Sequence, residues 1–569
     1  MKRQLIIGNY CLAMGIAVAL AAGCKKYPNV APVFEKQELN ADSVKRKVLV
    51  ISIDGLPGSE LKAATGLTNI AALLKTAKFS YAEARLPRPA TDGSSWASLL
   101  TGVTPVTHGI TDSSFEYKNT DPASSGGRVP YAMDIFRILN INKPSYTSAL
   151  VTPWANLARY AERTATYSYG VLNDAVVKDS AVRLLNRDTS LSLMVVNFNE
   201  VALAGKAAGN YSLTNPAYKT ALEKADGYIG NILQAMNARP GKSKEQWLVI
   251  VTSNPGAVAN PLPGFLICAY PSFSGQEVKK VGYSTVLFND DTSTYAYVPN
   301  PELYDPKLPD EFTVQVRTYN LDGRTYPGII SKSSPKIGNI QNSIKGWMWL
   351  NVSNGAVQYE ANFGSGSQKA PQTAVSGSES VNQWHTYTMQ VRYTSSTNRR
   401  VTMFVDGNNR GGAFDLSLID FSNPAEPFKL GFRKVDASIP MQFYAADLVY
   451  FNTALPDSII KNYVNLVDYS RHPYYKNLTG WWPLDEASGN VAYNYAPTGS
   501  DMVLNGSFRW VKLDPNVPPG RTPAPPDATV SINAAVTDIA AHLKYWMNLK
   551  TMTVGISNSW LSNFSAEIK

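Results

Sequence analysis

Histidine and cysteine are the scarce residue types in this sequence. The 569 residues include only 4 histidines and 3 cysteines. These are His108, His385, His472 and His542, and Cys11, Cys24 and Cys268. Zinc sites are built mainly from imidazoles and thiolates, so this chain has few residues from which to build one. Stability has to come from burial of a hydrophobic core, for which a chain of this length is ample.

Long hydrophobic runs are also missing, and the first residues have the pattern of a targeting segment. Lys2 and Arg3 precede a short apolar run, and Leu20–Cys24 resembles a lipobox. We therefore predict a lipoprotein signal peptide over residues 1–23, lipidation of Cys24 and a polar tether over 24–45. Because no Asp follows Cys24, we expect anchoring in the outer membrane, at the cell surface. Cys268 is then left without a partner for an intrachain disulfide.

The charge balance is mildly basic. The chain has 53 Lys and Arg against 44 Asp and Glu, a formal charge of +9. Removal of Lys2 and Arg3 leaves 51 against 44, or +7. The basic residues are scattered and form no stripe, which argues against nucleic-acid binding and indicates an ordinary solvated surface.

Residues 46–282 alternate between apolar strands and amphipathic helices. The near-continuous run Lys47–Ile53 predicts a strand buried on both faces, and it ends in Asp54–Gly55. Further strands are predicted at 148–152, 191–198, 246–252 and 265–269, with helices at 68–75, 154–163 and 218–237. This rhythm predicts a doubly wound, mostly parallel α/β sheet, in which Asp54 lies at the ligand edge.

The stretch from Ala90 to Ser113 carries the most specific motif. A polar turn at 91–95 precedes an apolar helical run, Trp96–Leu100, which Gly102 ends, and T-G-x-x-P-x-x-H-G-I runs from Thr101 to Ile110. This order resembles the nucleophile segment of the type I phosphodiesterase/nucleotide pyrophosphatase branch of the alkaline-phosphatase superfamily. The resemblance implies an alkaline-phosphatase-like fold and a two-metal phosphoester site.

The resemblance also assigns positions to the nucleophile and the metal ligands. The nucleophile position falls on Asp92, which has no hydroxyl, and of the ligand positions only Asp54 keeps its acid. Where the family has D-x-x-x-H and S-D-H-G, this chain has substitutions. The degenerate positions are Asp54, Asp92, Ala202, Lys206, Asn254 and Pro255.

No imidazole pair remains for zinc, so we expect a pseudoenzyme without a cofactor. One alternative is a weak Mg²⁺ or Ca²⁺ site at Asp54 and Asp92. Another is that Lys206 pairs with one of these acids and replaces the metal charge. A third is that both acids are ordinary capping or solvated residues.

Residues 283–511 change to period-two alternation with Gly, Asn, Ser and Pro turns. This pattern predicts an antiparallel sandwich, and several strands resemble the concanavalin-like, laminin-G-type jelly roll. Such domains often bind glycans through aromatic side chains. The candidates are Trp347, Trp349, Trp384, Trp481 and Trp482, although a tryptophan on an alternating strand is more often part of a core.

Residues 512–569 are predicted to contain a linker and the last part of the α/β domain. Residues 512–527 are Pro-rich and predict a stiff linker. Residues 528–569 include Asp538–Ile539–Ala540, which resembles the closing helix of the phosphodiesterase family. The all-β sandwich is therefore predicted to interrupt the α/β domain.

Three hypotheses of function remain. The first is a surface lipoprotein with a silent hydrolase-like domain and a glycan- or protein-binding sandwich, acting with other envelope proteins in glycan capture or uptake. The second is an active metal-dependent phosphodiesterase or phosphatase that the sandwich targets. The third is a structural partner of another envelope protein.

Overall fold

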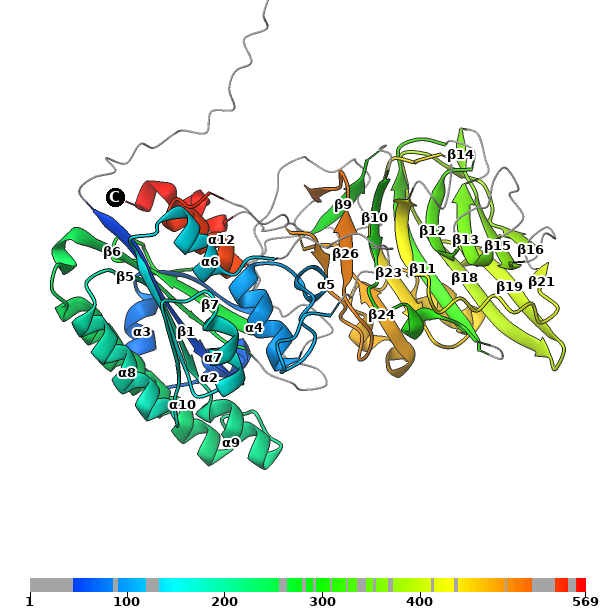
Figure 1. The fold of residues 1–569 in the computed structure, drawn as a ribbon. Helices are drawn as coiled ribbons and strands as arrows, with labels where there is room; N and C mark the ends of the chain where they lie inside the picture. The colour runs from blue at the N-terminus through cyan, green and yellow to red at the C-terminus, as the bar shows by residue number, and fades with distance from the viewer. Residues whose placement is uncertain are drawn as a thin grey trace, which may run out of the picture. The chain divides into compact units, whose positions relative to one another are not determined.

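The structure is a computed structural model, shown in Figure 1. It describes residues 44–84, 91–118, 132–254, 263–278, 283–289, 293–307, 310–323, 326–334, 344–351, 355–366, 372–410, 414–433, 439–486, 489–513, 538–550 and 559–568. Several predicted features lie outside these residues: the signal peptide, Cys24, nearly all of the tether, Pro255 and most of the Pro-rich linker.

The first part of the chain forms a mixed sheet, called sheet A here. Its spatial order is β4 (Tyr167–Gly170), β3 (Thr147–Thr152), β5 (Leu191–Phe198), β1 (Lys45–Ile53), β6 (Glu245–Thr252), β7 (Gly264–Ala269), β2 (Ala77–Ala84) and β8 (Gln276–Glu277). β4, β3, β5 and β1 are parallel neighbours, whereas β7 runs antiparallel to both β6 and β2.

Both faces of sheet A are covered, as the apolar run of β1 predicts. Val48 and Val50 join a core on one face, and Leu49, Ile51 and Ile53 join a core on the other. Figure 1 shows helices on both sides of the sheet. The first core takes side chains from α4 (Asp92–Thr101), α6 (Ile135–Asn142), α7 (Ala155–Ala161) and α12 (Asp538–Trp546). The second takes them from α2 (Gly58–Ala63), α3 (Thr68–Leu74), α8 (Asp174–Arg187), α9 (Glu200–Ala208) and α10 (Pro216–Ala238).

The C-terminal residues belong to the same core as β1. Trp546 of α12 is buried, and its Nε1–H donates to the carbonyl of Lys47 at 3.0 Å. Leu561 of η5 (Trp560–Glu567) and Ile568 lie in this core as well. The α/β fold therefore uses residues from both sides of the intervening β-rich region.

The β-rich region contains two antiparallel sheets. Sheet B has the order β16 (Gln372–Val375), β15 (Tyr359–Ser365), β13 (Lys345–Asn351), β12 (Gly328–Ser333), β22 (Lys429–Arg433), β10 (Ser293–Tyr297), β26 (Met502–Asn505) and β25 (Val491–Ala492). Sheet C has the order β20 (Asn408–Asn409), β19 (Asn398–Val405), β18 (Trp384–Ser395), β11 (Phe312–Asn320), β23 (Phe443–Phe451), β9 (Ser284–Phe288) and β27 (Arg509–Lys512), with β21 (Phe414–Asp415) beside β19 and β24 (Leu478–Trp482) beside β23. One hydrophobic core joins side chains of both sheets.

Shorter elements complete the two parts. In the α/β domain they are α5 (Pro105–His108) and η1 (Lys242–Lys244). In the β-rich region they are the pair β14 (Ala356–Val357) and β17 (Glu379–Ser380), and α11 (Asp457–Tyr463), η2 (Pro301–Tyr304), η3 (Tyr469–Arg471) and η4 (Tyr475–Asn477).

The predicted fold class is confirmed: a mostly parallel α/β sheet is accompanied by an antiparallel sandwich. One local prediction was wrong, because residues 92–95 form the first turn of α4 and not a separate polar turn. The cause is a capping box, in which Thr91 and Ser94 exchange side-chain to backbone hydrogen bonds. Within the described residues, no helix has the length and apolarity to cross a bilayer.

Candidate functional site

The N-terminus of α4 places Asp92 at the edge of the candidate site. Thr91 is the N-cap, and its Oγ1 accepts from the backbone N–H of Ser94 at 3.1 Å. Asp92 is the first residue of the helix, partly exposed, where the helix dipole favours a carboxylate. A Cβ on Gly93 would lie 2.2 Å from the carbonyl oxygen of Asp112, so residues 112–113 cross this helix end in close contact.

Asp54 lies directly after β1 and is buried. The Ser52 hydroxyl donates to its Oδ1 at 2.6 Å, and Trp96 Nε1–H donates to its Oδ2 at 3.1 Å. Burial raises the pKa of Asp54 to about 7, while hydrogen bonds from Ser52, Trp96 and Asn197 act to lower it. The charge of Asp92 raises it slightly, so the two carboxylates influence each other. Each oxygen of the retained acid thus accepts from a side chain of the protein itself.

Asn254 follows β6 and connects three elements. Its carbonyl accepts from the N–H of Gly55 at 2.7 Å, and its Nδ2 donates to the backbone carbonyl of Asp92 at 3.3 Å. Its Oδ1 is buried and has no hydrogen-bond partner among the described residues, and the same holds for Ser95 Oγ. Both are neutral oxygens, and neither brings a charge to hold a metal ion.

α9 carries two of the positions that the resemblance assigns to metal ligands, Ala202 and Lys206. Ala202 has a packing role, and Lys206 is exposed to solvent. A Cβ built on Gly55 would lie 2.5 Å from Ala202 Cα and 2.7 Å from Ala202 Cβ, so α9 packs directly on the end of β1. Lys206 is exposed in the last turn of α9. The groups that act on the titration of Asp54 are Ser52, Trp96, Asn197 and Asp92. Lys206 is not among them, so the ion pair with Asp54 that the sequence left open finds no support in the titration of Asp54.

The described histidines are engaged elsewhere. His108 Nδ1 accepts from the N–H of Ile110 at 3.0 Å, and its Nε2 lies 2.9 Å from Ser98 Oγ. Burial lowers the pKa of His108 to about 3, and that of His542 also to about 3. Across the described part of the chain, no group of three or more His, Cys, Asp or Glu side chains is placed to hold a metal ion. The described residues therefore do not supply the ligands of a two-metal centre.

Three side chains of this site were not singled out in the sequence. Ser52 could have been, because it is two residues before Asp54 and shares a face of the strand with it. Asn197 is the second-last residue of β5, the parallel neighbour of β1, and its Oδ1 accepts from Thr152 Oγ1 at 2.8 Å. Trp96 is 42 residues from Asp54, and no local signal connects them.

The candidate glycan-binding tryptophans require a correction. All five are buried: Trp347, Trp349 and Trp482 are 0% exposed, Trp481 is 8% exposed and Trp384 is 9% exposed. Trp347 and Trp482 each pack against Phe428 in the core between sheets B and C. Trp481 packs against Tyr469 and Tyr495, and Trp384 packs against Tyr319. These rings contribute to the cores and present no open face on which a sugar could stack.

The geometry of sheet A and α4 agrees with a comparison against protein families. Residues 48–268 match the family model of type I phosphodiesterase / nucleotide pyrophosphatase. The resemblance recognised in the sequence is thus confirmed over these residues. No match to the chain was found among curated proteins.

Several solved structures are similar to parts of the chain. Murine ectonucleotide pyrophosphatase/phosphodiesterase 5 aligns with 17% identity and a TM-score of 0.29, covering 37% of this chain and 56% of that one. The phosphonate monoester hydrolase of Agrobacterium radiobacter aligns with 13% identity and a TM-score of 0.29, covering 41% and 70%. A Bacteroides ovatus protein described as carbohydrate-binding aligns with 13% identity and a TM-score of 0.30, covering 52% and 73%. Such distant similarities decide neither activity nor ligand.

Proposed function

We propose that the α/β domain is a catalytically silent scaffold in a lipid-anchored surface protein, and that the sandwich is its binding module. The observation that carries the first part is the state of Asp54. It is the retained acid of the family's site, and both of its oxygens already accept hydrogen bonds from Ser52 and Trp96. Its neighbours Ala202 and Asn254 bring no charge, so a pair of metal ions would lack the ligands that hold them.

We assign the binding role to the sandwich because, on this proposal, the α/β domain has no catalytic activity. We assign to the sandwich either a glycan or the surface of another envelope protein. The five buried tryptophans are not the contact residues in this proposal. The same proposal has two further parts, which are anchoring through Cys24 at the outer membrane and a role as an accessory of glycan capture or uptake. Both parts rest on the lipobox-like sequence.

The competing function is a metal-dependent phosphodiesterase. The family match of residues 48–268 favours it, and so does the proximity of Asp54 and Asp92, whose charges interact. A weak Mg²⁺ or Ca²⁺ site at these two acids belongs to this second function. The ligands that it would need beyond these acids are missing from the described residues.

One experiment separates the two functions. The mature chain, made soluble by replacing Cys24 with serine, is purified without chelator. Its metal content is measured by mass spectrometry, and turnover of p-nitrophenyl phosphate and bis-p-nitrophenyl phosphate is measured on the same sample. We expect neither bound metal nor turnover. Near-stoichiometric zinc together with turnover abolished by a chelator would overturn the scaffold proposal.

The binding proposal is tested on the same protein with a glycan array and a pull-down from envelope extracts. Binding to a defined glycan class, retained by the sandwich when Asp54 is replaced with asparagine, supports a glycan-binding module. Absence of any glycan signal would move the assignment to a protein partner.

A further inference from the structure

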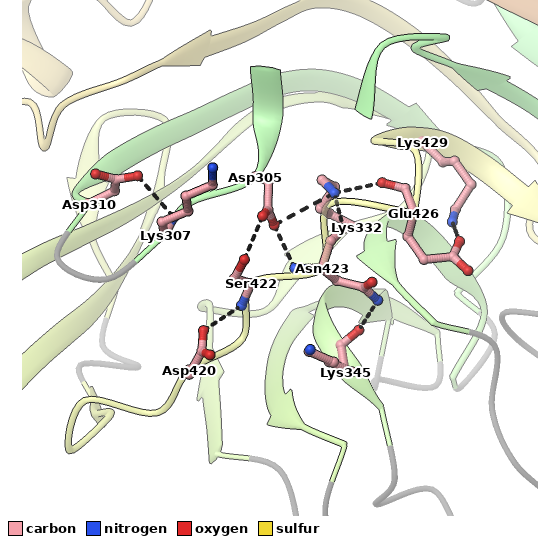
Figure 2. Close-up of polar contacts among 10 residues, drawn as sticks. All are labelled: Asp305, Lys307, Asp310, Lys332, Lys345, Asp420, Ser422, Asn423, Glu426 and Lys429. Carbon is pink, nitrogen blue, oxygen red and sulfur yellow. Dashed lines mark hydrogen bonds and ion pairs between the residues drawn. The ribbon is translucent and has the colours of Figure 1, made fainter. Parts of the chain in front are cut away.

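A buried charged cluster lies inside the sandwich, far in sequence from the site described above. Its centre is Lys332 of β12, which is 0% exposed (Figure 2). The Lys332 ammonium donates to the backbone carbonyls of Asn423 and Glu426, each at 2.6 Å. Its Nζ also lies 3.7 Å from Asp305 Oδ1. Three oxygen atoms from two separate parts of the chain thus surround one positive charge.

The residues from Asp420 to Glu426, called the 420–426 segment here, form the other half of this arrangement. Asp305 Oδ2 accepts from the hydroxyl of Ser422 at 2.5 Å, and its Oδ1 accepts from the backbone N–H of Asn423 at 2.6 Å. The segment is also held by Asn423 Nδ2, which donates to the carbonyl of Lys345 at 2.8 Å. Figure 2 shows Asp305 joined by dashed lines to Ser422, Asn423 and Lys332. Asp305 accepts hydrogen bonds from the donors of the 420–426 segment, and Lys332 donates to two backbone carbonyls of the same segment.

The charges in the cluster balance. Besides Lys332 and Asp305, the side chains of Lys429 and Glu426 lie 3.3 Å apart, with Lys429 fully buried. Burial lowers the pKa of Lys332 to about 8, and the carboxylate of Asp305 acts in the opposite direction. At neutral pH the lysine is therefore still an ammonium, and the two lysines match the two carboxylates.

The oxygen set around Lys332 is the kind that a hard metal ion prefers. Ca²⁺ in proteins is held by carboxylates and backbone carbonyls, often supplied by a loop. A lysine ammonium is a compact point charge with three donors, so it can satisfy a similar set of oxygens without a metal. Without a cation, two carbonyls and a carboxylate would face one another in a buried space, which is unfavourable.

We propose that the Lys332 ammonium is a built-in cation that fills a latent metal site: it holds the 420–426 segment against the sandwich in place of Ca²⁺. Replacement of Lys332 by a short side chain opens this oxygen cage to Ca²⁺. The anchoring of the 420–426 segment is consequently independent of Ca²⁺ in the native protein, whatever the ligand of the module is.

The test uses the mature chain with Cys24 replaced by serine, and compares it with the same chain carrying Lys332→Ala. Melting temperatures are measured with and without millimolar CaCl₂, and Ca²⁺ binding is measured by equilibrium dialysis with ⁴⁵Ca. We expect Lys332→Ala to melt at a lower temperature and to regain about 2–4 °C with CaCl₂. It should also bind an additional Ca²⁺ ion per chain, while the parent protein responds to neither treatment.

Two control variants locate the effect. Lys332→Met removes the charge but keeps the stem that fills the cage, so it should be destabilised without any response to CaCl₂. Lys332→Ala combined with Asp305→Asn removes the carboxylate ligand and should lose the extra ion. A response of Lys332→Met equal to that of Lys332→Ala would place the Ca²⁺ elsewhere and overturn the proposal.

A second short side chain keeps the test decisive if Lys332→Ala does not fold. Lys332→Ser offers an additional oxygen and is prepared in parallel, with and without CaCl₂ throughout expression and purification. Recovery of folded protein only in CaCl₂ supports the proposal. Failure of both variants to fold or to bind Ca²⁺ in the presence of CaCl₂ overturns it.

Discussion

Gly55 and Ala202 are in direct contact, since a Cβ added to Gly55 would lie 2.5 Å from the Cα of Ala202. Gly55 has a φ of +77° and follows Asp54 at the end of β1. Ala202 occupies a position to which the phosphodiesterase resemblance assigns a carboxylate. The contact holds α9 close to the end of β1. In this chain the position to which the resemblance assigns a carboxylate makes a packing contact.

This contact predicts a large cost for any side chain at residue 55. Gly55→Ala combines a left-handed backbone with a clash against the backbone of α9, and we expect a loss of about 2–4 kcal/mol in the free energy of unfolding. Gly209→Ala is the matched control: it has a φ of +61° and nothing within 4 Å of its Cβ. It should cost only about 1 kcal/mol. Equal losses in urea unfolding would show that the packing against Ala202 contributes nothing.

Asp54 predicts a specific dependence of stability on pH. Its pKa is raised by burial from 3.8 to about 7. The contribution to stability is therefore complete below about pH 4 and is lost as the pH rises through about 7, by at most about 4 kcal/mol. Asp54→Asn keeps a neutral side chain of the same shape at every pH. We expect the stability of the parent protein relative to this variant to fall between pH 5 and pH 8.

The measurement is urea unfolding of both proteins across this pH range. Asp179→Asn, which replaces an exposed carboxylate, serves as the control and should leave the pH profile of the parent unchanged. A constant difference between the parent and Asp54→Asn from pH 5 to pH 8 would mean that Asp54 does not titrate in this range. In that case the acid is held ionised, as a metal ligand would be.

Part of this architecture follows from local sequence and part does not. The strand predicted at 191–198 coincides with β5, because an apolar run of that length between polar residues can be buried on both faces. The hydrogen bond from Trp96 to Asp54 could not be predicted, since it depends on how α4 docks on sheet A. The reversed direction of β7 is equally a property of the assembled sheet. The period-two patterns placed the tryptophans on strands. They could not show that the strand faces carrying these side chains are all buried.

The buried tryptophans predict a loss of stability instead of a loss of ligand binding. Trp482 is 0% exposed, and its Nε1–H donates to the carbonyl of Ser500 at 3.1 Å. Trp482→Ala should lower the free energy of unfolding by about 3–5 kcal/mol. Tyr326→Ala, at a side chain that is 40% exposed, should change it by less than about 0.5 kcal/mol. If Trp482→Ala weakened binding to a glycan without lowering stability, a direct role for this ring would be restored.

The last prediction concerns the C-terminal residues that complete the α/β domain. Lys78 of β2 is 0% exposed, and its ammonium lies 2.7 Å from Glu567 Oε1 in η5. The Glu567 carboxylate also accepts from the backbone N–H of Ser274 at 2.8 Å, so it links η5 to the segment after β7. Among the described residues, Glu567→Ala leaves the buried ammonium with the neutral hydrogen-bond acceptors Ser274 and Gln276, and it should cost about 1–3 kcal/mol.

The matched control is the exposed ion pair between Lys62 and Glu277, whose atoms lie 3.4 Å apart. Lys62→Ala should cost less than about 0.5 kcal/mol, because water already screens that pair. Both variants are compared by urea unfolding in low and high salt. A loss in Glu567→Ala that persists in high salt indicates a buried contact between η5 and sheet A. A cost as small as that of Lys62→Ala would mean that η5 contributes little to closing the domain, and that α12 carries that role through Trp546.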